Sequence, residues 1–114
     1  MSESEPPLLR IEHEVSAEDV VVRMIGELDV STAPMVEAQI AALRPLAAPL
    51  SLDVRDLTFV DSSGLRAMTA ARRAALEDTT RPVTLIGCGP ALRSLLELTG
   101  LATAFEGVAP DGGA

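Results

Sequence analysis

Apolar and polar residues alternate near the start of the chain, in residues 8–15, and a second stretch, residues 20–28, is rich in β-branched residues. In the first stretch, one face carries Leu9, Ile11, His13 and Val15. A period of two is typical of a strand with one buried face. Because only the short polar turn Ser16–Asp19 separates the stretches, we predict an antiparallel hairpin.

Beyond the hairpin, apolar residues recur every three or four positions in three segments, as in amphipathic helices. These helices are predicted to start after Ser31 or Thr32, near residue 62, and at Pro90. Strands are predicted between and after them, and their expected positions are residues 50–60, 82–88 and 104–106. The order is β-β-α-β-α-β-α-β.

This order predicts an α/β domain with a mixed β-sheet of four to five strands and parallel, right-handed crossovers after the hairpin. In the third strand, apolar Leu52 and Val54 alternate with polar Asp53 and Arg55. A sheet covered on both faces has mostly apolar strands. We therefore expect the helices to pack on one face only. The domain is expected to span residues 8–106, after a disordered lead (1–7) and before a frayed tail (107–114).

Composition narrows the choice of partner. The 114 residues carry a formal charge of −8, with 17 acidic residues, nine arginines and no lysine. Nucleic acid and anionic membranes bind clustered positive charge, so we expect neither as a partner. A lone cysteine, Cys88, no long apolar run and no signal peptide favour a cytoplasmic protein. No metal-ligand spacing or phosphate loop occurs, so no cofactor is expected.

The candidate chemistry lies at Asp61-Ser62-Ser63-Gly64, between the third strand and the second helix. Small polar residues cap helices, so the two serines are consistent with capping alone. An exposed serine hydroxyl at a helix start is also suited to carry a phosphate, which the helix dipole tolerates. A catalytic serine is not supported, because Gly-x-Ser-x-Gly is missing and the one histidine, His13, lies in the first strand. An enzyme is not expected.

Asp29 follows the second strand as Asp61 follows the third. If these strands are parallel neighbours, both loops emerge at one edge of the sheet, where ligands and partners of α/β sheets gather. Asp29 would then share a surface with Ser62. A turn residue before a helix cap is the alternative interpretation of Asp29.

Three segments in this order resemble the STAS domains, specifically the stand-alone bacterial anti-sigma factor antagonists. They are Gly26-Glu27-Leu28-Asp29, Leu57 to Leu65 with its Asp-Ser-Ser-Gly-Leu block, and Pro90-Ala91-Leu92 through Leu101. The resemblance implies a mixed sheet with helices on one side. It also implies that the unmodified protein binds an anti-sigma factor serine kinase and frees the sigma factor. Phosphorylation of Ser62 by that kinase ends binding, and a metal-dependent serine phosphatase restores it.

In this interpretation Asp61, Ser63 and Gly64 shape the loop, and Asp29 lines the contact surface. Arg66 stands where some relatives have a small residue, so it either pairs with a phosphate or marks a different partner kinase. Many relatives carry a final helix beyond the last strand that is not seen here, and we expect a monomer or a weak dimer. Two alternatives stay open: a STAS adaptor subunit of a signalling assembly or transporter without phosphoswitching, and a small-ligand sensor.

Overall fold

The computed structural model describes residues 8–43, 46, 48–78, 83–101 and 107–109. The predicted disordered lead, residues 1–7, lies outside this part of the chain, as does the end of the tail. The elements in chain order are β1 (Leu9–Val15), β2 (Val20–Leu28), α1 (Ala33–Leu43), β3 (Leu50–Val60), α2 (Ser62–Asp78), β4 (Val83–Ile86), α3 (Pro90–Thr99) and β5 (Gly107–Ala109).

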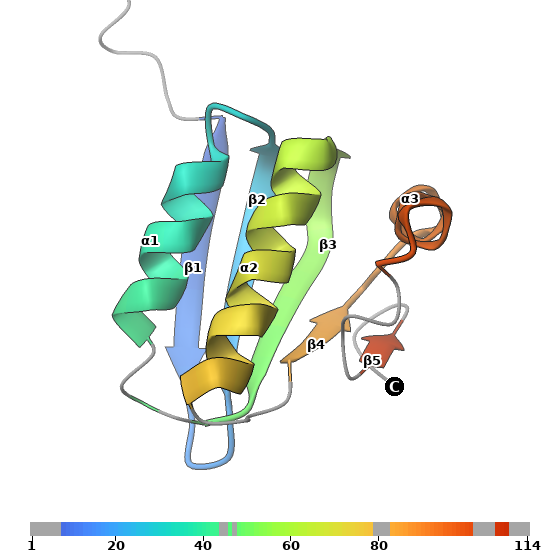
Figure 1. The fold of residues 1–114 in the computed structure, drawn as a ribbon. Coiled ribbons are helices and arrows are strands. Elements are labelled where there is room, and N and C mark those ends of the chain that lie inside the picture. Colours follow the sequence, from blue (N-terminus) through green and yellow to red (C-terminus); the bar gives the residue numbers. More distant parts are fainter. Residues whose placement is uncertain (1–7, 44–45, 47, 79–82, 102–106, 110–114) are drawn as a thin grey trace, which may run out of the picture.

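The five strands form one mixed sheet in the order β1-β2-β3-β4-β5 (Figure 1). The β1–β2 hairpin is antiparallel, and the other three pairings are parallel. This confirms the predicted mixed sheet and the predicted element order. It also places the carboxyl ends of β2 and β3 at the same edge, because Leu28 pairs with Val60.

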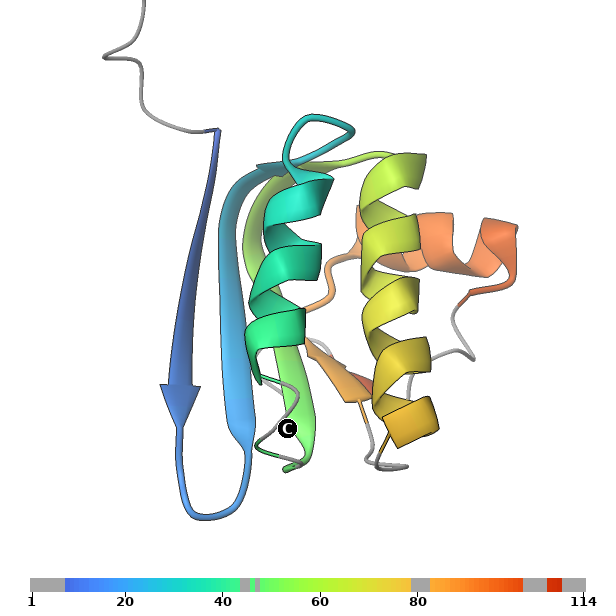
Figure 2. The ribbon, with the colours of Figure 1, turned by 60° about the vertical axis from the view of Figure 1, so that its left-hand side comes forward.

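Helices α1 and α2 lie side by side over one face of the sheet (Figures 1 and 2), as the alternation in β3 predicted. Helix α3 runs across their direction, beside the carboxyl end of β4. The core between helices and sheet consists of aliphatic side chains. The largest that are fully buried are Leu9, Met24, Leu28, Leu50, Leu52, Met68, Leu85 and Leu96.

The opposite face of the sheet is polar. Arg23 on β2 pairs with Asp56 on β3 at 2.7 Å, and Arg55 pairs with Asp53 at 2.8 Å. Burial alone would raise the pKa of Asp53, but its hydrogen bonds from Arg55 more than offset this and lower the pKa. On this face Asp53 is buried with its charge compensated by Arg55, whereas Arg55 and Asp56 reach solvent, and the face needs no covering helix.

Strand β3 is longer than the strands beside it, and this shapes the edge near residue 62. Its eleven residues lie against the nine of β2 with two register shifts, each of which places one extra residue in β3. On the other side, β4 pairs only with Leu50–Asp53. The rest of β3 lies near α3, and a groove of about 230 Å³ between them is lined by Leu57, Thr58, Phe59, Val60, Ala91, Leu92 and Leu95.

The C-terminal part of the described chain contains a helix cap and a short edge strand. Gly100 ends α3 with a left-handed backbone, and the Leu101 N–H donates to the Leu96 carbonyl at 2.9 Å, a common form of helix cap. The edge strand predicted at residues 104–106 lies outside the described residues. A strand is present at Gly107–Ala109, in the segment expected to be frayed, where these residues pair with Thr84–Ile86.

Candidate functional site

Asp61 caps the first turn of α2. Its Oδ1 accepts a hydrogen bond of 3.0 Å from the Gly64 N–H, and its carbonyl accepts one of 3.0 Å from the Leu65 N–H. Its own N–H donates to the Leu28 carbonyl at 3.2 Å, which ties the end of β3 to the end of β2. The capping role is therefore filled by the aspartate, and the interpretation of the two serines as caps is wrong.

The hydroxyl of Ser62 is left without a structural task. Ser62 is exposed and Ser63 half-buried, and neither hydroxyl forms a hydrogen bond within the part of the chain that the structure describes. A side chain that supports no turn and faces solvent can be modified without loss of a contact. Ser62 is thus accessible to an enzyme at a position that the backbone holds firmly.

Gly64 explains why that position is firm. A Cβ at residue 64 would lie 2.7 Å from Leu28 Cγ and 2.8 Å from the Leu28 carbonyl oxygen. These distances are well below van der Waals contact, so only glycine allows the first turn of α2 to approach the end of β2 this closely. The glycine thereby fixes how Ser62 is presented at the edge.

Asp29 holds the turn that leads into α1. Its Oδ1 accepts from the Ser31 hydroxyl at 2.7 Å, the Ser31 N–H at 2.9 Å and the Thr32 N–H at 3.2 Å. The Thr32 hydroxyl faces backward, donating to the Glu27 carbonyl at 2.8 Å and accepting from the Asp29 N–H at 2.9 Å. Thr32 directly precedes α1, as predicted, but the carboxylate of Asp29 satisfies the free N–H groups. This supports the interpretation of Asp29 as a turn residue.

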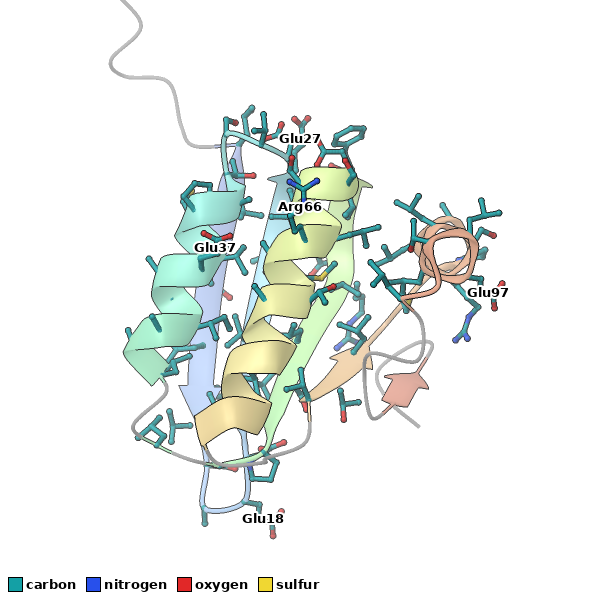
Figure 3. The ribbon with its side chains drawn as sticks, in the orientation of Figure 1. Glu18, Glu27, Glu37, Arg66 and Glu97 are labelled. Atoms are coloured by element: carbon teal, nitrogen blue, oxygen red, sulfur yellow. The ribbon has the colours of Figure 1, made fainter. Side chains whose placement is uncertain are left out.

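The two loops do share one edge. Asp29 and Asp61 directly follow Leu28 and Val60, which are paired. Figure 3 shows Glu27 at this edge, near the end of α2 from which Arg66 projects. The predicted juxtaposition of Asp29 with the Ser62 loop is therefore confirmed as geometry. Their role in partner binding stays a prediction.

Two exposed apolar side chains at this edge were not singled out from the sequence. Val30 in the Asp29 loop is 72% exposed, and Phe59 near the end of β3 is 51% exposed. Phe59 pairs with Glu27 on β2, next to the second register shift. A signal for Phe59 was available, since it occupies an odd, outward position in the alternation of the third strand. Val30 and Phe59 are therefore available as apolar contact area at this edge.

The other candidates have ordinary surroundings. Cys88 is buried, and this burial raises the pKa of its thiol. His13 is exposed, with Nδ1 2.7 Å from Gln39 Nε2 on α1. Among the described residues, no group of three or more His, Cys, Asp or Glu side chains is placed to hold a metal ion. No helix in the described ranges has both the length and the apolar character of a membrane span.

The turn at Asp29 yields a prediction on pH. Hydrogen bonds, first from the Ser31 hydroxyl and then from the amides of Ser31 and Thr32, hold the pKa of Asp29 below its ordinary value despite an opposing desolvation effect. The stabilisation is therefore present at neutral pH and is lost as pH falls through the folded-state pKa. In NMR titrations we expect the amide signals of Ser31 and Thr32 to move together below pH 4, about the ordinary aspartate pKa.

The matched control for this titration is Asp29→Asn, which keeps the shape of the side chain and removes its ionisation. The shared step should disappear in this variant. Signals that titrate together in the variant as well would show that another group controls the turn.

The fold and the strand–helix junction together define a domain of the STAS class, with a mixed sheet, helices on one face and a capped serine loop at the carboxyl edge. Comparison with known families agrees. The family described as "Mlab, STAS domain" matches residues 11–108, and the chain belongs to this family.

Individual relatives carry consistent names. A protein of Lysinibacillus sphaericus named "Anti-sigma F factor antagonist" is 29% identical over 89 residues, which cover 76% of this chain and 75% of the relative. The solved structure of an anti-sigma factor antagonist from Mycobacterium paratuberculosis has 30% identity and a TM-score of 0.76, covering 88% of this chain and 85% of that one. The Bacillus cell fate determinant SpoIIAA, solved in its phosphorylated form, has 26% identity and a TM-score of 0.66, covering 87% and 91%.

Proposed function

We propose that this protein is an anti-sigma factor antagonist whose binding is switched by phosphorylation of Ser62. In the unmodified state it binds an anti-sigma factor that is also an ATP-dependent serine kinase, and the sigma factor is released. The kinase then transfers phosphate to Ser62, and the modified protein dissociates. A metal-dependent serine phosphatase returns it to the binding state.

The observation that carries this proposal is the free, exposed hydroxyl of Ser62 at a rigid junction. Asp61 already caps α2 through the Gly64 N–H, so the fold does not need that hydroxyl. The names of the relatives, and the phosphorylated form of SpoIIAA, support the same kind of switch. A stable fold with a replaceable surface group is what a reversible modification requires.

Phosphorylation would change the surface and leave the fold in place. A phosphoserine adds about −1.5 to −2 charges and three acceptor oxygens. Asp29 and Asp61 already make this edge acidic, and Val30 and Phe59 provide apolar contact area beside it. A partner that fits this surface closely would then face a new desolvated charge, which costs several kcal/mol at an interface.

The modified residue can be identified directly. After incubation with the cognate anti-sigma kinase and ATP, peptide mapping by mass spectrometry should find one phosphate, on Ser62. The Ser62→Ala variant should accept none and should still bind the kinase, while Ser63→Ala should be modified normally. A phosphate on Ser63 alone, or no phosphate, would contradict the proposal.

Purification of the protein together with its bound partners tests the adaptor alternative. Co-purification of a transporter subunit or a large signalling assembly, with no phosphate on Ser62, would favour a docking function for the loop. Co-purification of an ATPase related to histidine kinases would favour the switch.

A further inference from the structure

A hollow lies beside the first turns of α2, on the side that faces the end of α3. Its volume is about 320 Å³, and it is lined by Ser62, Leu65, Arg66, Thr69, Thr99 and Leu101. The hydroxyls of Thr69 and Thr99 are engaged within their own helices, donating to the Leu65 carbonyl at 2.8 Å and the Leu95 carbonyl at 2.9 Å. The guanidinium of Arg66 is therefore the main source of available N–H donors in this hollow.

Arg66 differs from other arginines of the chain. Arg10, Arg23 and Arg55 each form an ion pair with a carboxylate. Arg66 is exposed, and across the described ranges it forms no ion pair or hydrogen bond with another residue. In a chain with 17 acidic residues and nine arginines, a free cation at an acidic edge is available for a further anion.

Helix geometry directs Arg66 toward Ser62. Residues four apart on a helix lie on the same face with Cβ atoms about 5–6 Å apart, and side chains lean toward the helix N-terminus. The negative group at i with the positive group at i+4 is the favourable order. Figure 3 shows Arg66 on the first turns of α2, projecting near the edge where β2 ends.

From these observations we propose that Arg66 binds the phosphate of phosphorylated Ser62 within the same chain, in the hollow beside α2. This inference rests on the phosphorylation of Ser62 proposed above. The planar guanidinium can donate two parallel N–H bonds to phosphate oxygens, a geometry that a lysine does not offer. Arg66 is then a phosphate-binding residue of the switched state, and no contact of the unmodified fold depends on it.

The surrounding charges give this contact a function. The charged residues in the loops and helix ends around the phosphate include Glu27, Asp29, Glu37, Asp61, Arg93 and Glu97, of which Glu97 points away from α2 in Figure 3. Most are acidic, so they oppose the second ionisation of a phosphoserine, whose ordinary pKa is about 6. Arg66 favours the doubly charged form, and the phosphate keeps its full charge at neutral pH, which is the state that repels the partner most strongly.

A ³¹P NMR titration tests the contact. Phosphoserine is incorporated at position 62 during synthesis of the full chain, in the native sequence, in Arg66→Gln and in Arg10→Gln. Arg10→Gln is the control, because it removes the same positive charge from the β1–β2 hairpin and not from α2. We expect the second phosphate pKa of the native sequence to lie about 0.5 unit below that of Arg66→Gln, the size typical of an exposed ion pair, and Arg10→Gln to match the native value.

A second readout is the Nε–H signal of Arg66, assigned by its absence in Arg66→Gln, which should move downfield when Ser62 carries phosphate. Equal phosphate pKa values in the native and Arg66→Gln chains would overturn the phosphate site and leave the proposed switch intact. Because the phosphoserine is built in during synthesis, no kinase is required. A lowered pKa in a protein that no anti-sigma kinase modifies would support the site and remove the switch.

Discussion

Replacing Ser62 by Glu is expected to weaken binding of the anti-sigma kinase about a hundredfold, which corresponds to about 2.7 kcal/mol. The reason is placement: the new carboxylate adds to the charge of Asp61 and Asp29 at the edge where Val30 and Phe59 offer apolar contact. A like charge forced into an interface costs several kcal/mol. Ser62→Ala should bind within a factor of two of the native chain, because the hydroxyl makes no hydrogen bond within the described structure.

The matched control for this experiment is Ser94→Glu, which adds the same charge at an exposed position of α3. Calorimetric affinities should be nearly equal for this control and the native chain. The thermal midpoints of all three variants should lie close to the native value, since none of these side chains is part of the core. Equal weakening by both glutamates would show that net charge alone, and no particular surface, controls binding.

Gly64→Ala is expected to destabilise the fold by about 1–3 kcal/mol, the usual cost of overpacking. Helix propensity alone predicts the opposite, because alanine is favoured over glycine inside a helix by up to about 1 kcal/mol. The steric effect should dominate, since the new Cβ would lie 2.7 Å from Leu28 Cγ and 2.8 Å from the Leu28 carbonyl. To relieve this contact, the first turn of α2 must move, and Ser62 with it. Urea unfolding measures the stability.

Gly89→Ala provides the control for the glycine experiment. A Cβ at Gly89 would meet nothing within 4 Å, and its backbone has φ −75°, which alanine adopts without strain. Gly89 is the N-cap of α3, where alanine is less favourable than glycine, so a loss of up to about 1 kcal/mol is expected here without any steric term. A Gly64→Ala variant that is more stable than the native chain would show that α2 does not pack closely on β2.

The alternation of side chains was enough to predict most of the architecture. It identified the polar outer face of β3, from which one-sided helix packing followed, while the β-branched residues of Val20–Leu28 located β2. These features depend on burial along a regular strand, which a period of two reports directly. The common edge of Asp29 and Asp61 then followed from parallel pairing.

Features that depend on particular atoms were not predictable in this way. Asp61, Ser62 and Ser63 are all good caps, and only the coordinates show that the aspartate binds the Gly64 N–H. Gly64 was expected only to shape the loop, whereas its importance comes from the nearness of Leu28.

The strand Gly107–Ala109 was not predicted, for a related reason. A run of three residues is too short to show a period of two, and its pairing with β4 makes it a strand. The local residue pattern does not show a strand that forms only because its backbone pairs with another strand.

The central claim is that one exposed hydroxyl at the junction of β3 and α2 controls a protein contact. The most direct test compares the affinity of the anti-sigma kinase for the unmodified chain and for the same chain fully phosphorylated on Ser62, measured by calorimetry before and after treatment with phosphatase. The account predicts at least a hundredfold loss on phosphorylation and full recovery afterwards. Equal affinity of the two forms, with Ser62 verified as the modified residue, would contradict it.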